Sequence, residues 1–131
     1  MAEKSKYSKV LLIDDNSIDN FVNKKLIEMT GFASDVEVYE SGEEALKALK
    51  ERKKDQLPDV IFLDIMMPVM DGFAFLEEFN KLGQDHREKC KIIMLSTSES
   101  FQDLNKANKN PLVQKFLNKP LTEAVLEAIN V

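Results

Sequence analysis

Cysteine, positive charge and long apolar runs are scarce in this sequence. The single cysteine among 131 residues cannot form an internal disulfide, which is typical of a protein kept in a reducing compartment. No apolar stretch approaches the roughly 18 residues of a membrane-spanning helix, and the amino terminus MAEKSKYSK is polar. We therefore expect a cytoplasmic protein with no membrane insertion.

The charge balance disfavours nucleic acid as a partner. Lys and Arg number 18 against 23 Asp and Glu, so the formal net charge of -5 leaves no large cationic surface. The chain has no internal repeat, low-complexity tract or interdomain linker, and 131 residues with 44% hydrophobic content suit one core. We expect a single domain over residues 1–131, with a core at about 8–130 and no output domain.

Short apolar runs alternate along the chain with segments of helical period. The strand candidates are VLLI (10–13), DVEVY (35–39), VIFL (60–63), IIML (92–95) and VQKFL (113–117). Alternation of strand and helix predicts a parallel sheet covered by helices on both faces, which explains why the central runs are apolar throughout. The predicted fold class is therefore α/β, a doubly wound (βα)5 domain.

Capping residues mark the predicted helices. The segment SIDNFVNKKLIEMTG ends on Gly31, a residue suited to helix termination. Its apolar residues recur on one stripe, namely Ile18, Phe21, Val22, Leu26 and Met29. Ser41 and Asp71 are placed to cap the next two helices. His86 falls in the polar connection LGQDHREK, where we expect it to be solvated.

Polar residues stand where the predicted strands end. Asp14 and Asp15 follow the first strand, Asp64 the third, Ser96 the fourth, and Lys119 comes just after the fifth. Ligands of open α/β sheets bind at this edge, outside the carboxyl ends of the strands. Taken singly, Asp15 could cap a helix and Lys119 could be a surface lysine. Two carboxylates about 4 Å apart repel by roughly 4 kcal/mol at an effective dielectric near 20, so such a cluster favours a divalent cation and a lysine.

These motifs resemble a known family, the receiver domain of two-component response regulators. The resemblance covers about residues 8–130 and rests on the acidic pair, the stretch DIMMPVMDG after the third strand, the LSTS that begins at Ser96, and the Lys119-Pro120 pair. It implies a flavodoxin-like sheet of order 2-1-3-4-5. It also implies that Asp64 is a phosphoacceptor, whose donor is a histidine kinase or a histidine phosphotransfer protein.

The resemblance further implies a role for each site residue. Mg²⁺, which prefers oxygen ligands, would be held by Asp14, Asp15 and Asp64 together with the backbone carbonyl of Met66. Ser96 and Lys119 would contact the phosphoryl group, Ser96 and Phe116 would form a switch, and the bond before Pro120 would be cis. The expected protein is not an enzyme but a phosphoacceptor that assists its own phosphorylation and dephosphorylation. It would signal by binding an unknown partner or by phosphorelay.

Two other classes of protein share parts of this pattern. A metal-dependent phosphohydrolase with an aspartyl nucleophile would carry a second acid two residues after the nucleophile, where this chain has Met66. A flavodoxin-like cofactor binder would need a phosphate cradle after the first strand, where Asp14 and Asp15 would repel the phosphate. Both alternatives fit the residues less well than a receiver does.

Overall fold

The computed structural model describes residues 5–97 and 101–131, which form five strands separated by helices. The strands are β1 (Tyr7–Ile13), β2 (Ala33–Tyr39), β3 (Val60–Asp64), β4 (Lys91–Ser96) and β5 (Val113–Asn118). The helices are α1 (Ser17–Thr30), α2 (Gly42–Lys50), α3 (Gly72–Asn80), α4 (Gln84–Lys89), α5 (Phe101–Lys109) and α6 (Glu123–Ala128), with a 3-10 turn η1 at Lys54–Gln56. Within the described ranges, no helix has both the length and the apolar character needed to cross a membrane.

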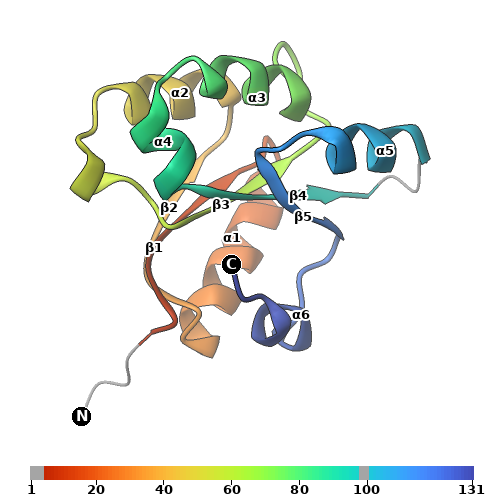
Figure 1. Ribbon diagram of the computed structural model, residues 1–131. Coiled ribbons are helices and arrows are strands. Elements are labelled where there is room, and N and C mark those ends of the chain that lie inside the picture. The colour runs from red at the N-terminus through yellow and green to blue at the C-terminus, as the bar shows by residue number, and fades with distance from the viewer. Residues whose placement is uncertain (1–4, 98–100) are drawn as a thin grey trace.

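The five strands form one parallel sheet of order β2-β1-β3-β4-β5. Helices α1 and α6 lie on one face of this sheet, and α2, α3, α4 and α5 lie on the other (Figure 1). The predicted fold class and strand order are therefore confirmed. The order reverses direction between β1 and β3, so the carboxyl ends of these two strands form the crevice where ligands of such sheets bind.

Both faces of the central strands are buried, as their unbroken apolar runs predict. In β3, Ile61 and Leu63 belong to the core beneath α2 and α3, whereas Val60 and Phe62 belong to the core beneath α1 and α6. Successive side chains of a strand point to opposite faces. A strand that is covered on both sides therefore has no side chain exposed to solvent, and apolar residues are favoured at every position. Asp64, the last residue of β3, is buried as well, and it ends this apolar run.

The predicted caps are present at three helix ends. Gly31 ends α1 in the left-handed region with φ of 72°, which glycine adopts without a steric penalty. The side chains of Ser41 and Asp71 accept hydrogen bonds from backbone N–H groups at the starts of α2 and α3. At the start of α1 the cap is Asn16 and not Asp15, so the carboxylate of Asp15 is not used for capping.

Helix α1 turns most of its apolar stripe toward solvent. Ile18, Phe21, Val22 and Met29 are exposed, and only Leu26 of the stripe packs against the core. The buried face of α1 instead carries Asn20, Asn23 and Ile27. The 3.6-residue period of the sequence predicts the helix correctly, but the apolar side of this helix is not the side that covers the sheet.

A short helix, α4, replaces the polar connection expected around His86. The imidazole of His86 is buried, and its Nε2 atom lies 2.7 Å from the carbonyl oxygen of Leu49 at the end of α2. The ring also packs against Phe79 in a T-shaped arrangement, with 6.3 Å between centroids. The expectation of a solvated histidine is therefore wrong, because the ring forms part of the contact between α4, α2 and α3.

Candidate functional site

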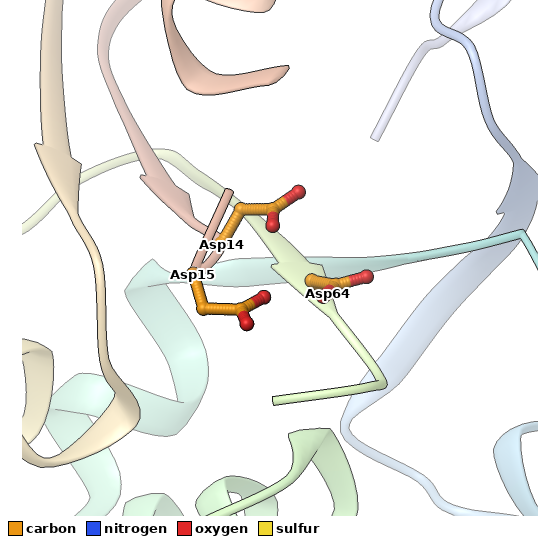
Figure 2. A group of neighbouring side chains, drawn as sticks. All are labelled: Asp14, Asp15 and Asp64. Carbon is orange, nitrogen blue, oxygen red and sulfur yellow. The ribbon is translucent and has the colours of Figure 1, made fainter. Parts of the chain in front are cut away.

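Three carboxylates meet at the carboxyl edge of the sheet. Asp14 and Asp15 directly follow β1, and Asp64 ends β3, whose residue Leu63 is paired with Ile13 of β1. One oxygen from each carboxylate can be chosen such that all three lie within 4.8 Å of one another. Figure 2 shows the side chains projecting from these neighbouring strand ends. Asp14 and Asp64 are buried, while Asp15 is exposed.

Lys119 brings a positive charge to this cluster from the end of β5. Its Nζ atom donates to Asp14 Oδ2 at 2.5 Å and lies 3.2 Å from Asp64 Oδ1. The backbone N–H of Lys119 donates to the carbonyl oxygen of Ser96 at 2.9 Å, which ties the ends of β4 and β5 together. Ser96 itself is fully buried, and the peptide bond between Lys119 and Pro120 is cis.

The electrostatics of the cluster work against a charged Asp64. Burial and the neighbouring charges of Asp14 and Asp15 raise the pKa of Asp64 from 3.8 to about 6, although Lys119 opposes this shift. Burial alone would lower the pKa of Lys119, but its hydrogen bonds and charge interactions with Asp14 and Asp64 outweigh that effect and raise it. The lysine is therefore held as an ammonium ion, while the carboxylates still have unbalanced negative charge.

The loop between β3 and α3 is folded tightly against Asp64. The N–H of Gly72 donates to the carbonyl oxygen of Ile65 at 2.8 Å, and a Cβ atom at Gly72 would lie 2.8 Å from the carbonyl oxygen of Asp64. Between these ends, the side chains of Met66 and Val69 point into solvent. Val69 has φ of 68°, a left-handed conformation that a β-branched residue rarely adopts. The loop thus holds two apolar side chains outward beside the acidic cluster.

The structure brings most of the predicted site residues to one edge of the sheet, namely Asp14, Asp15, Asp64, Ser96 and Lys119. Phe116 lies two residues before the end of β5, is half buried and packs against the core beneath α3 and α5. The metal-ligand role of the Met66 carbonyl stays a prediction. Sequence reasoning missed one neighbour, Asp19 of α1, whose carboxylate also reaches Lys119. In the sequence, Asp19 is recognisable only as an acid in the first turn of α1. An acid at that position is already explained by its favourable interaction with the helix dipole.

The donor set fits a hard divalent cation. Carboxylate oxygens are the ligands that Mg²⁺ prefers, and it binds through a few of them while retaining several water molecules. The cluster offers three such carboxylates, one of them exposed, and no sulfur or imidazole ligand. Its excess of negative charge beyond Lys119 also favours a cation over an anionic ligand.

Comparison with known proteins identifies the family. The sequence matches the family described as response regulator receiver domain over residues 10–130. The chain belongs to this family. It is 30% identical over 115 residues to the probable methanogenesis regulatory protein FilR2 of Methanothrix harundinacea, which corresponds to 86% of the chain and 72% of that protein. Receiver domains are phosphoacceptors of two-component systems and work with histidine kinases.

Solved structures agree with this assignment. A two-component response regulator from Cytophaga hutchinsonii superposes on the receiver with a TM-score of 0.84 at 32% identity, over 95% of this chain and 93% of that one. The receiver domain of the histidine kinase CKI1 from Arabidopsis thaliana, complexed with Mg²⁺ and BeF3-, superposes with a TM-score of 0.74 at 26% identity, over 93% and 91%. The receiver spans only 11% of full-length CKI1.

Proposed function

We propose that this receiver accepts a phosphoryl group on Asp64 from the phosphohistidine of a histidine kinase or a histidine phosphotransfer protein, in a Mg²⁺-dependent reaction. The observation that carries the proposal is the placement of Asp64, buried at the carboxyl edge of the sheet between an acidic pair and an ammonium group. Asp14, Asp15, Asp64 and the backbone carbonyl of Met66 are the proposed ligands of the metal.

The chemical step follows from the groups that line the site. A carboxylate oxygen of Asp64 attacks phosphorus, an O–P bond forms, the N–P bond of the phosphohistidine breaks, and the departing imidazole takes up a proton from solvent. When bound, Mg²⁺ supplies positive charge that lowers the repulsion between the carboxylate and the phosphoryl oxygens. Lys119 Nζ donates to one phosphoryl oxygen, and the hydroxyl of Ser96 donates to another.

Exposed apolar side chains on both sides of the cluster support a protein as the phosphodonor. Ile18, Phe21 and Val22 lie in the first two turns of α1, which begins just after the acidic pair, and Met66 and Val69 lie in the loop after Asp64. These five side chains are between 54% and 94% exposed. Apolar surface of this kind marks interaction sites, and a protein that delivers a phosphoryl group to Asp64 would contact it.

The same proposal extends to the output of the receiver. Contact between the phosphoryl group and Ser96 draws this hydroxyl toward Asp64, and Phe116 responds by changing its rotamer. The face formed by α5, β5 and α6 then presents a different surface to a downstream protein. Such a shift needs a differential interaction of only about 1.4 kcal/mol for a tenfold change in population. If Phe116 does not respond, the receiver acts as a phosphate carrier in a relay.

We also propose that the receiver works in the cytoplasm without contacting nucleic acid. In this role it assists its own phosphorylation and dephosphorylation and turns over no separate substrate. The net charge of -5 supports the absence of a nucleic-acid partner.

Phosphate incorporation tests the proposal. The wild-type receiver is incubated with radiolabelled acetyl phosphate or a phosphorylated histidine kinase, with Mg²⁺ or with EDTA. We expect Mg²⁺-dependent labelling in wild type and none in Asp64→Asn. Asp55→Asn, an exposed acid in η1 that precedes β3, is the matched control and should label normally. Normal labelling of Asp64→Asn would place the acceptor elsewhere and refute the proposal.

A further inference from the structure

Lys119 has a third carboxylate partner beyond the residues assigned so far. The Nζ atom of Lys119 donates to Asp19 Oδ2 at 3.2 Å, the same distance that separates it from Asp64 Oδ1. The lysine side chain is 11% exposed, and the side chain of Asp19 is 40% exposed, so Asp19 approaches Lys119 from the solvent side. The ammonium group therefore lies between an inner pair of carboxylates, Asp14 and Asp64, and an outer one.

The start of α1 fixes Asp19 in this position. The side chain of Asn16 accepts hydrogen bonds from the backbone N–H groups of Ile18 and Asp19, both at 3.0 Å. One turn further, Asn20 Nδ2 donates to the carbonyl oxygen of Asp14 at 2.7 Å, which ties the helix to the end of β1. The backbone that carries Asp19 is thus held to the residue that begins the acidic cluster.

Asp19 differs from the other acids in its place relative to the proposed cation site. The oxygens of Asp14, Asp15 and Asp64 come within 4.8 Å of one another, and Asp19 is not part of that group. A cation bound by these three carboxylates is attracted to the negative charges of Asp14 and Asp64 and repels the ammonium group of Lys119. The charge of Asp19 is not shared with the cation, so it stays available to the buried lysine.

We propose that Asp19 is a positioning residue for Lys119, an inference that rests on the proposed phosphoacceptor function. It holds the ammonium group at the edge of the cluster, where it is available to a phosphoryl oxygen and does not compete with the cation for Asp14 and Asp64. Without the carboxylate of Asp19, Lys119 depends on Asp14 and Asp64 alone among its described carboxylate partners and competes with the cation for both. The receiver then binds Mg²⁺ more weakly.

The first experiment observes the ammonium group directly. Proton–nitrogen NMR of ¹⁵N-lysine protein at low temperature follows the Lys119 ammonium signal, identified by its loss in Lys119→Met. In wild type the signal persists when Mg²⁺ is added. In Asp19→Asn it persists without Mg²⁺, because Asp14 and Asp64 still hold the lysine, but broadens with Mg²⁺; Asp19→Glu restores it. A signal unchanged by Mg²⁺ in Asp19→Asn overturns the proposal.

The second experiment separates an effect through Lys119 from a general loss of charge. Calorimetric titration with Mg²⁺ is carried out on wild type, Asp19→Asn, Lys119→Met and the double variant. Because the Asp19–Lys119 pair is partly exposed to solvent, Asp19→Asn should weaken Mg²⁺ binding by about fivefold when Lys119 is present. The effect should fall below about twofold in the Lys119→Met background. If Asp19→Asn weakens Mg²⁺ binding by the same factor with Lys119 present and in the Lys119→Met variant, the proposal is overturned.

A matched control and an independent readout complete the test. Glu28→Gln removes one exposed negative charge from the far end of the same helix and should leave both the ammonium signal and Mg²⁺ binding unchanged. A fivefold loss of Mg²⁺ affinity in Glu28→Gln would show that the effect of Asp19 comes from net charge, and it would overturn the proposal. Both measurements use unphosphorylated protein. A receiver that shows the Asp19 effect but is not labelled on Asp64 refutes the proposed function and leaves the positioning role standing.

Discussion

Replacement of Asp64 by Asn is expected to stabilise the metal-free receiver at neutral pH. Burial and the charges of Asp14 and Asp15 raise the pKa of Asp64 from 3.8 to about 6. The folded state therefore disfavours the charged form of this carboxylate. Asn has nearly the same shape and no charge, and Lys119 keeps Asp14 and Asp19 as partners in the variant. The substitution thus removes the unfavourable charge with little loss of packing.

The size of the gain follows from the shift in pKa. The rise in the pKa of Asp64 from 3.8 to about 6 corresponds to roughly 3 kcal/mol, at 1.36 kcal/mol for each tenfold change in the ionisation equilibrium. Water reaches the site beside the exposed Asp15 and screens these charges, so we expect a measured gain of about 1–2 kcal/mol. It would be a considerable part of the 5–15 kcal/mol that is typical of a folded domain.

The sign of the pH dependence is fixed by the direction of the shift. A carboxyl group with a raised pKa in the folded state destabilises the fold only where it is charged, so its penalty is absent below the unfolded pKa near 3.8 and complete above about 6. The stability difference between Asp64→Asn and wild type should therefore be close to zero near pH 4. It should grow as pH rises and level off above about pH 7.

Urea unfolding in EDTA, followed by circular dichroism at several pH values, measures this difference. The buffer contains EDTA because a bound cation would remove part of the penalty from wild type. Asp55→Asn, the exposed control in η1, should show no gain that depends on pH. A gain in Asp64→Asn of the same size at every pH, or no gain above pH 7, would refute the argument that burial and repulsion disfavour the Asp64 charge.

Three further changes test other parts of the structure. Gly72→Ala should destabilise the receiver by about 1–3 kcal/mol in urea unfolding, because its Cβ would meet the backbone of Asp64 and Ile65 at 2.8 Å and 3.0 Å; unchanged stability would contradict the close contact. His86→Ala should cost roughly 2–3 kcal/mol by the same assay, since it leaves a cavity and removes one of the donors to the Leu49 carbonyl, and a loss below about 0.5 kcal/mol would contradict this role. Met66→Asn should speed hydrolysis of the phosphorylated receiver in excess Mg²⁺, because an amide can orient the attacking water and a thioether cannot; an equal or slower rate would argue against this.

The sequence predicts the sheet well because the apolar pattern of each central strand results directly from the burial of that strand. Val60 to Leu63 are apolar without interruption since both faces of β3 are covered, and Gly31, Ser41 and Asp71 mark helix ends through local hydrogen bonds. The convergence of residues at the strand ends follows from parallel pairing alone. These features depend on neighbours along the chain or on a general rule of the fold, so no detailed contact is needed to infer them.

Other features depend on contacts that the sequence does not encode locally. Asp19 and Lys119 are 100 residues apart, and their pairing follows from how α1 lies against the strand ends. His86 looks polar and solvated in sequence, but its ring is buried because α4 packs against α2 and α3. The stripe that includes Phe21 has the right period for a helix, and period cannot tell whether the apolar side faces a sheet or solvent.

The exposed apolar side of α1 separates the stability of the fold from the proposed contact with the phosphodonor. Side chains such as Phe21 and Val22 add little to the core, so substitutions among them change the free energy of unfolding by small amounts. The residues that fix the helix are different ones, among them Asn20 and Ile27. A duplicated gene could therefore change the exposed set one residue at a time and acquire a new partner while the fold stays intact. If this face binds the phosphodonor as proposed, changes of partner can begin here at little cost in stability.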